Sequence, residues 1–74
     1  MVHRLIETTD ELPFPKRTLV EDVTTGRVGL LMAGLIERDK RNDRITRRVA
    51  FVRPRGGGYE WTTDFDNLKP VSGS

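Results

Sequence analysis

The 74-residue sequence predicts one small, mainly all-β antiparallel domain, and three observations carry this prediction. Thr24-Thr25-Gly26 is a turn signal between two apolar runs, and Gly56-Gly57-Gly58 is a second one. Between these turns, residues 45–53 are rich in β-branched and aromatic side chains, which is typical of a strand. The chain is too short to form more than one domain.

Residues 1–16 are expected to form an N-terminal arm that is ordered but irregular. Thr8 to Glu11 have the residue types that start or cap one helical turn. Leu12-Pro13-Phe14-Pro15 then forces extended backbone, because each proline fixes its own φ and restricts the residue before it. Phe14 is expected to pack on the core.

The domain proper is expected to span residues 17–71. It opens with a strand at 18–23 and the turn at Gly26, where glycine takes a positive φ without steric cost. Residues 27–37 are ambiguous. Their apolar spacing fits a helix, but Gly29 and Gly34 disfavour one, by about 1 kcal/mol each. We favour a long strand, bent at its glycines, and keep the helix as the alternative.

The rest of the chain alternates short strands with turns. A single 3-10 turn is expected just before the last strand, with Asp64 as its cap. The tail at 72–74 is expected to fray. The expected elements are a polar hairpin loop at 39–44, a strand at 45–53, a glycine turn at 54–58, a strand at 59–63, the 3-10 turn at 64–68 and a strand at 69–71.

This order of elements resembles the SH3-like barrel, including its KOW and Tudor types. In sequence, the segments 22–29 and 53–61 are similar to a group of small uncharacterised actinomycete proteins. The shared motifs are Thr25-Gly26-Arg27-Val28-Gly29 and a second one in which Arg53-Pro54 is followed by the glycine triplet and Glu60-Trp61. The resemblance implies a small SH3-like barrel with a strand at residues 27–37, and it implies no activity.

Composition limits the chemistry open to this chain. It has no cysteine and one histidine, His3, so a zinc site lacks its usual ligands, and we expect no metal and no cofactor. Serine occurs only at 72 and 74, and a carboxylate pair of Glu21 or Asp22 with Glu60 has no evident pocket. We therefore expect no enzyme and no small-molecule substrate. The lack of disulfides and of any long apolar run favours a cytoplasmic protein without membrane contact.

Positive charge is concentrated in the middle of the chain. Residues 37–55 carry a net charge of +5, whereas the whole chain carries +2. Arginine suits phosphate contacts, and an aromatic residue beside arginines is an ingredient of nucleic-acid binding. The hairpin Arg41–Arg55 is thus one candidate binding surface, and in the other interpretation its arginines simply pair with acids. Its candidate residues are Arg44, Arg47, Arg48, Arg53, Arg55 and Tyr59.

Trp61 is expected in the core, with Val28, Phe51 and Leu68 as neighbours. It is the only tryptophan, it alternates with polar residues along its strand, and no other side chain fills as much volume. The alternative is an exposed stacking platform formed with Tyr59.

A second candidate surface is apolar. If residues 27–37 form a strand, both of its faces are apolar, and a small sheet has only one core side. Leu31, Ala33 and Leu35 then need a cover, which is the N-terminal arm, a second copy or a partner protein. The sequence therefore favours a small non-catalytic binding or adaptor module that acts through protein contact or self-association. The alternative is a nucleic-acid-binding barrel.

Overall fold

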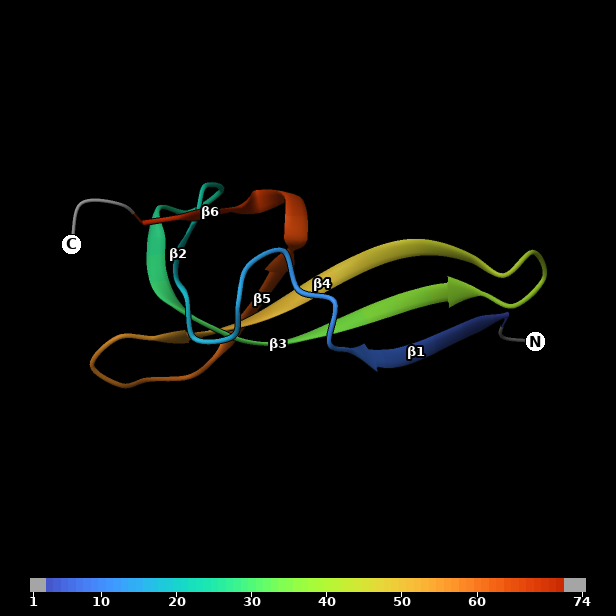
Figure 1. The fold of residues 1–74 in the computed structure, drawn as a ribbon, viewed down its shortest axis with the longest axis horizontal. Coiled ribbons are helices and arrows are strands. Elements are labelled where there is room, and N and C mark those ends of the chain that lie inside the picture. Colours follow the sequence, from blue (N-terminus) through green and yellow to red (C-terminus); the bar gives the residue numbers. More distant parts are fainter. Residues whose placement is uncertain (1–2, 72–74) are drawn as a thin grey trace.

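In the computed structural model, which describes residues 3–71, six strands form one antiparallel sheet with a single 3-10 turn (Figure 1). The order across the sheet is β5-β4-β3-β2-β6, and β1 pairs with β3 off this path. The predicted all-β class, a small barrel-like antiparallel fold, is confirmed. The elements are β1 (Arg4–Thr9), β2 (Leu19–Asp22), β3 (Arg27–Asp39), β4 (Arg44–Pro54), β5 (Trp61–Asp64), the 3-10 turn η1 (Phe65–Asn67) and β6 (Leu68–Pro70).

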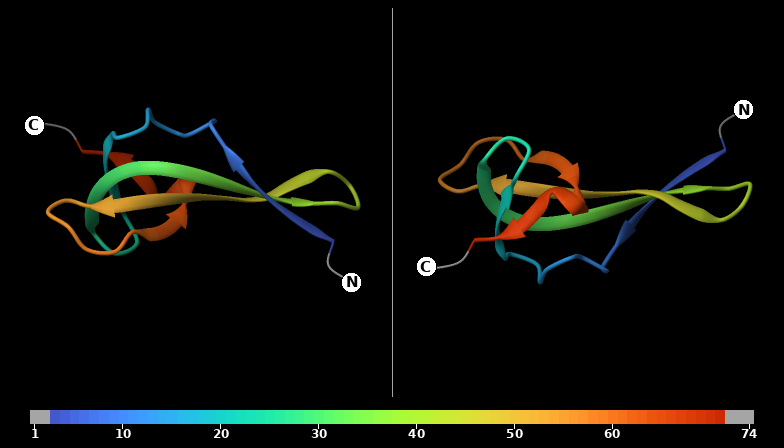
Figure 2. Two further views of the ribbon diagram at one scale, coloured as in Figure 1. Left: turned by 90° about the horizontal axis from the view of Figure 1, so that it is seen from below. Right: turned by 90° about the horizontal axis from the view of Figure 1, so that it is seen from above.

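The 13-residue strand β3 connects two parts of the molecule. Its first residues pair with β2, and residues 34–39 pair with β1 along the same edge. The part built from β1, residues 34–39 and residues 44–49 of β4 is called the ribbon here. It extends away from the end where β2, β5 and β6 gather (Figure 1), so the molecule measures 45 × 22 × 21 Å. Both views of Figure 2 show β1 crossing the β3–β4 hairpin at an angle, as expected of a twisted sheet.

The core lies at the end of the molecule where β2, β5 and β6 gather, which is called the barrel end here. Its buried residues are Val20, Leu31, Ala50, Val52 and Leu68. Leu12, Phe14, Trp61 and Phe65 are partly buried and pack against them, which confirms the expectation for Phe14.

Gly34 gives Leu12 and Phe65 room to lie on β3. A Cβ at this position would stand 2.7 Å from Leu12 Cδ2 and 2.9 Å from Phe65 Cζ. Glycine at this point therefore allows close packing across the sheet, as strand glycines often do.

Residues 27–37 form a strand, so the favoured interpretation of this segment is confirmed. The register against β4 shifts between Leu31 and Ala33, which marks a bulge at Met32 and not at a glycine. Because a bulge adds one residue, the strict alternation expected for this strand breaks there. Leu31 is 0% exposed in the core, whereas Ala33 is exposed and Leu35 half-buried. The expectation that these three side chains share one uncovered face was wrong.

The N-terminal arm is more regular than expected. Arg4–Thr9 form β1, which pairs with β3 without a register shift, and the helical turn expected at 8–11 is absent. The hydroxyl of Thr9 instead accepts a hydrogen bond from the Glu11 amide at 3.1 Å. The prediction of an irregular arm failed because β1 pairs with residues that lie about 30 positions away in sequence.

Three smaller expectations near the C-terminus also need correction. Tyr59 lies before β5 and is 93% exposed, so it does not share a strand with Trp61. Asp64 occupies the cap position of η1, but its side chain makes no capping hydrogen bond. Phe51 pairs across from Thr62, on the opposite face of β4 from the buried Ala50 and Val52, and so is not a core neighbour of Trp61.

The expected frayed tail, residues 72–74, lies outside the described residues. Within residues 3–71, no helix has the length and apolar character needed to cross a membrane.

Candidate functional site

The side of the sheet opposite the core carries an apolar groove along the ribbon. Leu35 and Val49 stand opposite each other in the β3–β4 register, and Phe51 follows on the same face of β4. Ile6 of β1 completes the groove and is 57% exposed. The groove has a volume of about 160 Å³ and is called the outer groove here. Its lining residues are Ile6, Leu35, Ile36, Glu37, Arg47, Val49, Phe51 and Thr62.

The outer groove contains one of the three side chains predicted for an apolar interface. Leu35 lines it, Leu31 is in the core, and Ala33 lies opposite Phe51 outside the lining. Ile6 and Val49 were missed. The β-branched residues Ile6, Thr8 and Thr9 were a signal for a strand, but which face Ile6 takes depends on its pairing with β3.

Charged side chains border the groove in alternating sign. Glu37 lies between Ile6 on β1 and Arg47 on β4 in the register, and Arg4 approaches its carboxylate at 3.7 Å. On the other face of the ribbon, Arg38 binds Glu7 at 3.3 Å. An apolar floor with a polar rim is the anatomy of a protein-contact surface.

The arginines of the hairpin do not form a single free patch. Arg41 pairs with Asp39 at 2.9 Å, Arg47 with Asp64 at 3.2 Å and Arg53 with Glu60 at 3.3 Å. In the described part of the chain, Arg44, Arg48 and Arg55 have no ion pair. Arg44 begins β4 and Arg55 directly follows its end, so the two lie roughly 36 Å apart at about 3.3 Å per residue. Half of these six arginines are therefore paired with acids, and the other half do not gather into one patch.

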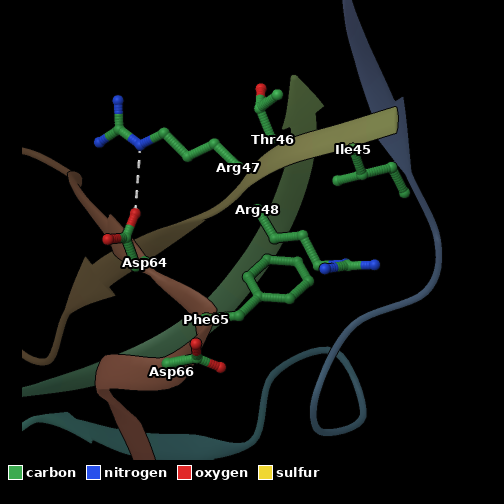
Figure 3. Close-up of a pocket in the computed structure, with 7 residues that line it drawn as sticks. All are labelled: Ile45, Thr46, Arg47, Arg48, Asp64, Phe65 and Asp66. Atoms are coloured by element: carbon green, nitrogen blue, oxygen red, sulfur yellow. Dashed lines mark hydrogen bonds and ion pairs between the residues drawn. The ribbon is translucent and has the colours of Figure 1, made fainter. Parts of the chain in front are cut away.

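Figure 3 shows a second hollow, of about 190 Å³, where β4 meets η1. Arg47 points to Asp64, and the Arg48 side chain runs beside the ring of Phe65 (Figure 3). Asp66 lies on the opposite wall from these arginines. With two acids and two arginines, the hollow has no excess of charge that would select an anion or a cation.

Asp22 and Trp61 form a buried polar contact at the barrel end. Asp22 is 2% exposed and accepts hydrogen bonds from Trp61 Nε1 at 3.1 Å, Thr24 Oγ1 at 2.6 Å and the Thr24 amide at 3.0 Å. The Arg27 guanidinium lies 3.9 Å from the centre of the indole ring. Trp61 therefore packs on the core as predicted, but it is half-buried, with a cation over one face.

Two carboxyl groups are held in the charged form. Burial by itself would raise the pKa of Asp22, but hydrogen bonds from Thr24, Trp61 and Thr63 outweigh it and leave the pKa below the ordinary 3.8. The hydrogen bonds from Arg41 lower the pKa of Asp39 to about 2. Asp22 thereby ties the turn after β2 to Trp61 of β5.

Acid should destabilise the protein partly through Asp22. Because the fold lowers the pKa of Asp22, the ionised carboxylate stabilises the fold at pH values above the ordinary pKa of 3.8. This contribution is lost as the pH falls below 3.8. We expect the urea midpoint of Asp22→Asn to be lower than wild type at pH 7 and to change less between pH 5 and 2. Circular dichroism during urea unfolding measures both.

Asp39→Asn is the matched control for this prediction, because Asp39 also has a lowered pKa but sits in the hairpin at the ribbon tip. In about 1 M salt the Debye length is about 3 Å, so the contribution of this pair, whose Arg41 side chain is 68% exposed, should fade while that of Asp22 persists. An equal salt response in both variants would contradict a buried role for Asp22.

The carboxylates considered for catalysis are each held by their own partner. Glu21 lies 3.7 Å from Lys69 Nζ, and Glu60 binds Arg53. Within residues 3–71 no three His, Cys, Asp or Glu side chains come together as metal ligands would. The outer groove, apolar and solvent-open, is the surface with the clearest chemical preference, which is for another apolar surface.

Searches with protein-family models, among curated proteins and among solved structures found no match to this chain.

Proposed function

We propose that this chain is a small non-catalytic binding module, acting in the cytoplasm through protein contact at the outer groove. The observation that carries the proposal is the set of apolar side chains Ile6, Leu35, Val49 and Phe51 on the face of the sheet that the core does not use. A monomer of this size rarely leaves such side chains grouped around a hollow without a binding role. The alternating charges on its rim favour a polypeptide over a nucleic acid.

Selection of peptides tests this proposal. A random peptide library displayed on phage is selected on the immobilised wild-type chain, and the affinity of the recovered peptides is measured by fluorescence anisotropy. We expect Leu35→Glu to weaken binding by about 30-fold, since a charge at the centre of an apolar contact costs on the order of 2 kcal/mol.

Val23→Glu is the matched control. Val23 is an exposed apolar residue, 51% exposed in the turn after β2, and it does not line the groove. Its variant should bind the same peptides within about twofold of wild type. Peptides that bind Leu35→Glu as tightly as wild type, or a library that enriches nothing, would contradict the groove as the binding surface.

Nucleic acid is the second candidate partner, favoured by Arg44 and Arg48, which lie on the same strand without an ion pair among the described residues. Two phosphate contacts predict a log–log salt slope of only about −1.4 for a single strand. Titration of labelled single-stranded RNA at low salt, with Arg44→Ala and Arg48→Ala in parallel, tests this. No binding at low salt would end this alternative.

A further inference from the structure

The first strand has an open edge along its whole length. In the described part of the chain β1 pairs only with β3, and in Figure 1 it forms the lower margin of the ribbon. Exposed edges are usually protected by prolines, bulges or charges, because their free backbone groups can pair with another strand. β1 has six consecutive register pairs with β3, without a bulge and without proline.

The other edges are protected or short. β6 has three residues and ends in Pro70, and β5 has four. The outer edge of β4 in the ribbon, beyond its pairing with β5, carries Arg44, Arg47 and Arg48, which repel a second copy of themselves. β1 is therefore the longest edge with the least opposition to pairing.

The direction of the free backbone groups on β1 follows from one hydrogen bond. The Lys40 amide donates to the His3 carbonyl at 2.7 Å, so the backbone groups of His3 point to β3. Because the direction alternates along a strand, Leu5, Glu7 and Thr9 also point to β3, and Arg4, Ile6 and Thr8 present their N–H and C=O groups outward. The outward set is centred on Ile6, which is also the most exposed apolar side chain of the outer groove.

We propose that this edge binds a second copy of the chain, with β1 and its copy antiparallel about a two-fold axis at Ile6. In this register Ile6 faces Ile6, Arg4 faces Thr8, and Leu5 faces Glu7 of the second copy. No like charges stand opposite one another, and every outward N–H and C=O between Arg4 and Thr8 finds a partner. The inference deepens the proposed contact role by naming one partner.

Neighbouring registers are poorer. Moving the axis to Glu7 places the two Glu7 carboxylates opposite each other, and moving it to Leu5 leaves Thr8 without a partner inside β1. An axis placed between two residues, such as Ile6 and Glu7, would pair residues whose backbone groups point outward with residues whose backbone groups point to β3. The sequence of β1 thus selects the register centred on Ile6.

Pairing in this register places the outer grooves of the two copies on one face of a continuous sheet, with the two Ile6 side chains in contact between them. The strand order across the pair is β4-β3-β1 followed by β1-β3-β4 of the second copy. A strand pair of five residues buries less than a standard interface, so we expect a weak dimer that dissociates on dilution.

Charge exchange at Ile6 tests both the dimer and its register. Sedimentation equilibrium of the wild-type chain should show the mass rising with concentration from 8.5 kDa toward twice that value. Ile6→Lys and Ile6→Glu should each stay monomeric, because each places like charges opposite one another. Their equimolar mixture should dimerise again. Val23→Lys and Val23→Glu, which change an exposed apolar residue outside the ribbon, should associate like wild type.

Amide hydrogen exchange gives a readout that needs no substitution. The Ile6 and Thr8 amides should exchange about tenfold more slowly when about 90% of the chain is dimeric, whereas those of Leu5 and Glu7, already bonded to β3, should change much less. A wild-type mass that stays at 8.5 kDa, or an equimolar mixture that stays monomeric, would overturn the proposal. A monomeric chain whose selected peptides still depend on Leu35 would overturn the dimer alone and leave the groove as the binding surface.

Discussion

Replacing Trp61 by alanine is expected to leave the chain largely unfolded at room temperature. The indole packs against the buried cluster around Val52 and donates to the buried Asp22. Truncating a large aromatic side chain costs about 3–5 kcal/mol. A domain this small holds on the order of 5 kcal/mol in total, so the variant loses most of its stability. Far-UV circular dichroism during urea unfolding measures the loss, since the variant has no tryptophan for fluorescence.

Trp61→Phe separates packing from hydrogen bonding. The phenyl ring retains most of the contact with the core but leaves the buried Asp22 carboxylate with one donor fewer. A lost hydrogen bond to a charged group costs about 1.5–3 kcal/mol, so this variant should fold with reduced stability. In this variant the pKa of Asp22 should rise toward its ordinary value of 3.8, which NMR titration of the carboxyl carbon would detect.

Arg27→Ala is the control for the exposed face of the ring. Removing a cation stacked on an indole at a solvent-open site costs about 0.5–1 kcal/mol, far less than losing the ring. A Trp61→Ala variant that stays folded and loses only ligand binding would contradict the packed position. It would instead favour the stacking platform that the sequence left open.

Features that depend on residues close together in the chain could be predicted from the sequence, whereas features that depend on distant pairings could not. The turn at Gly26, which has φ +76°, and the order of the later strands follow from residues close in the chain. The regular strand β1 depends on pairing with residues 34–39, and Arg47 pairs with Asp64 seventeen positions away. No local pattern encodes such pairings, which is why the arm was predicted irregular and the arginines were left undecided.

The predicted apolar interface failed at Leu31 for a similar reason. Alternation assigns Leu31, Ala33 and Leu35 to the same face of β3, and it would be correct in an uninterrupted strand. The expected signal for a bend was glycine, yet the register shifts at Met32, while Gly29 and Gly34 serve the close approach of other groups. A bulge is specified by how two strands meet, so the residue at which it falls is not written in either strand alone.

Leu31 and Leu35, four positions apart on β3, are expected to respond very differently to a carboxylate. Leu31→Glu should prevent folding, because an unpaired carboxylate would be forced into the centre of the core, where Leu31 is fully buried. Even Leu31→Ala should cost about 2–5 kcal/mol. Leu35→Glu should fold with a loss on the order of 1 kcal/mol, since its side chain lies in the open groove and can reach water.

Urea unfolding of the three variants, followed by tryptophan emission, measures the difference directly. Leu31 and Leu35 have the same side chain, lie on the same strand and differ only in the side of the bulge on which they stand. If Leu31→Glu folded with stability close to that of Leu35→Glu, the two would share a face and β3 would run without a shift at Met32. The groove would then extend along β3 through Ala33 to Leu31, and the contact surface would be the one that simple alternation predicts.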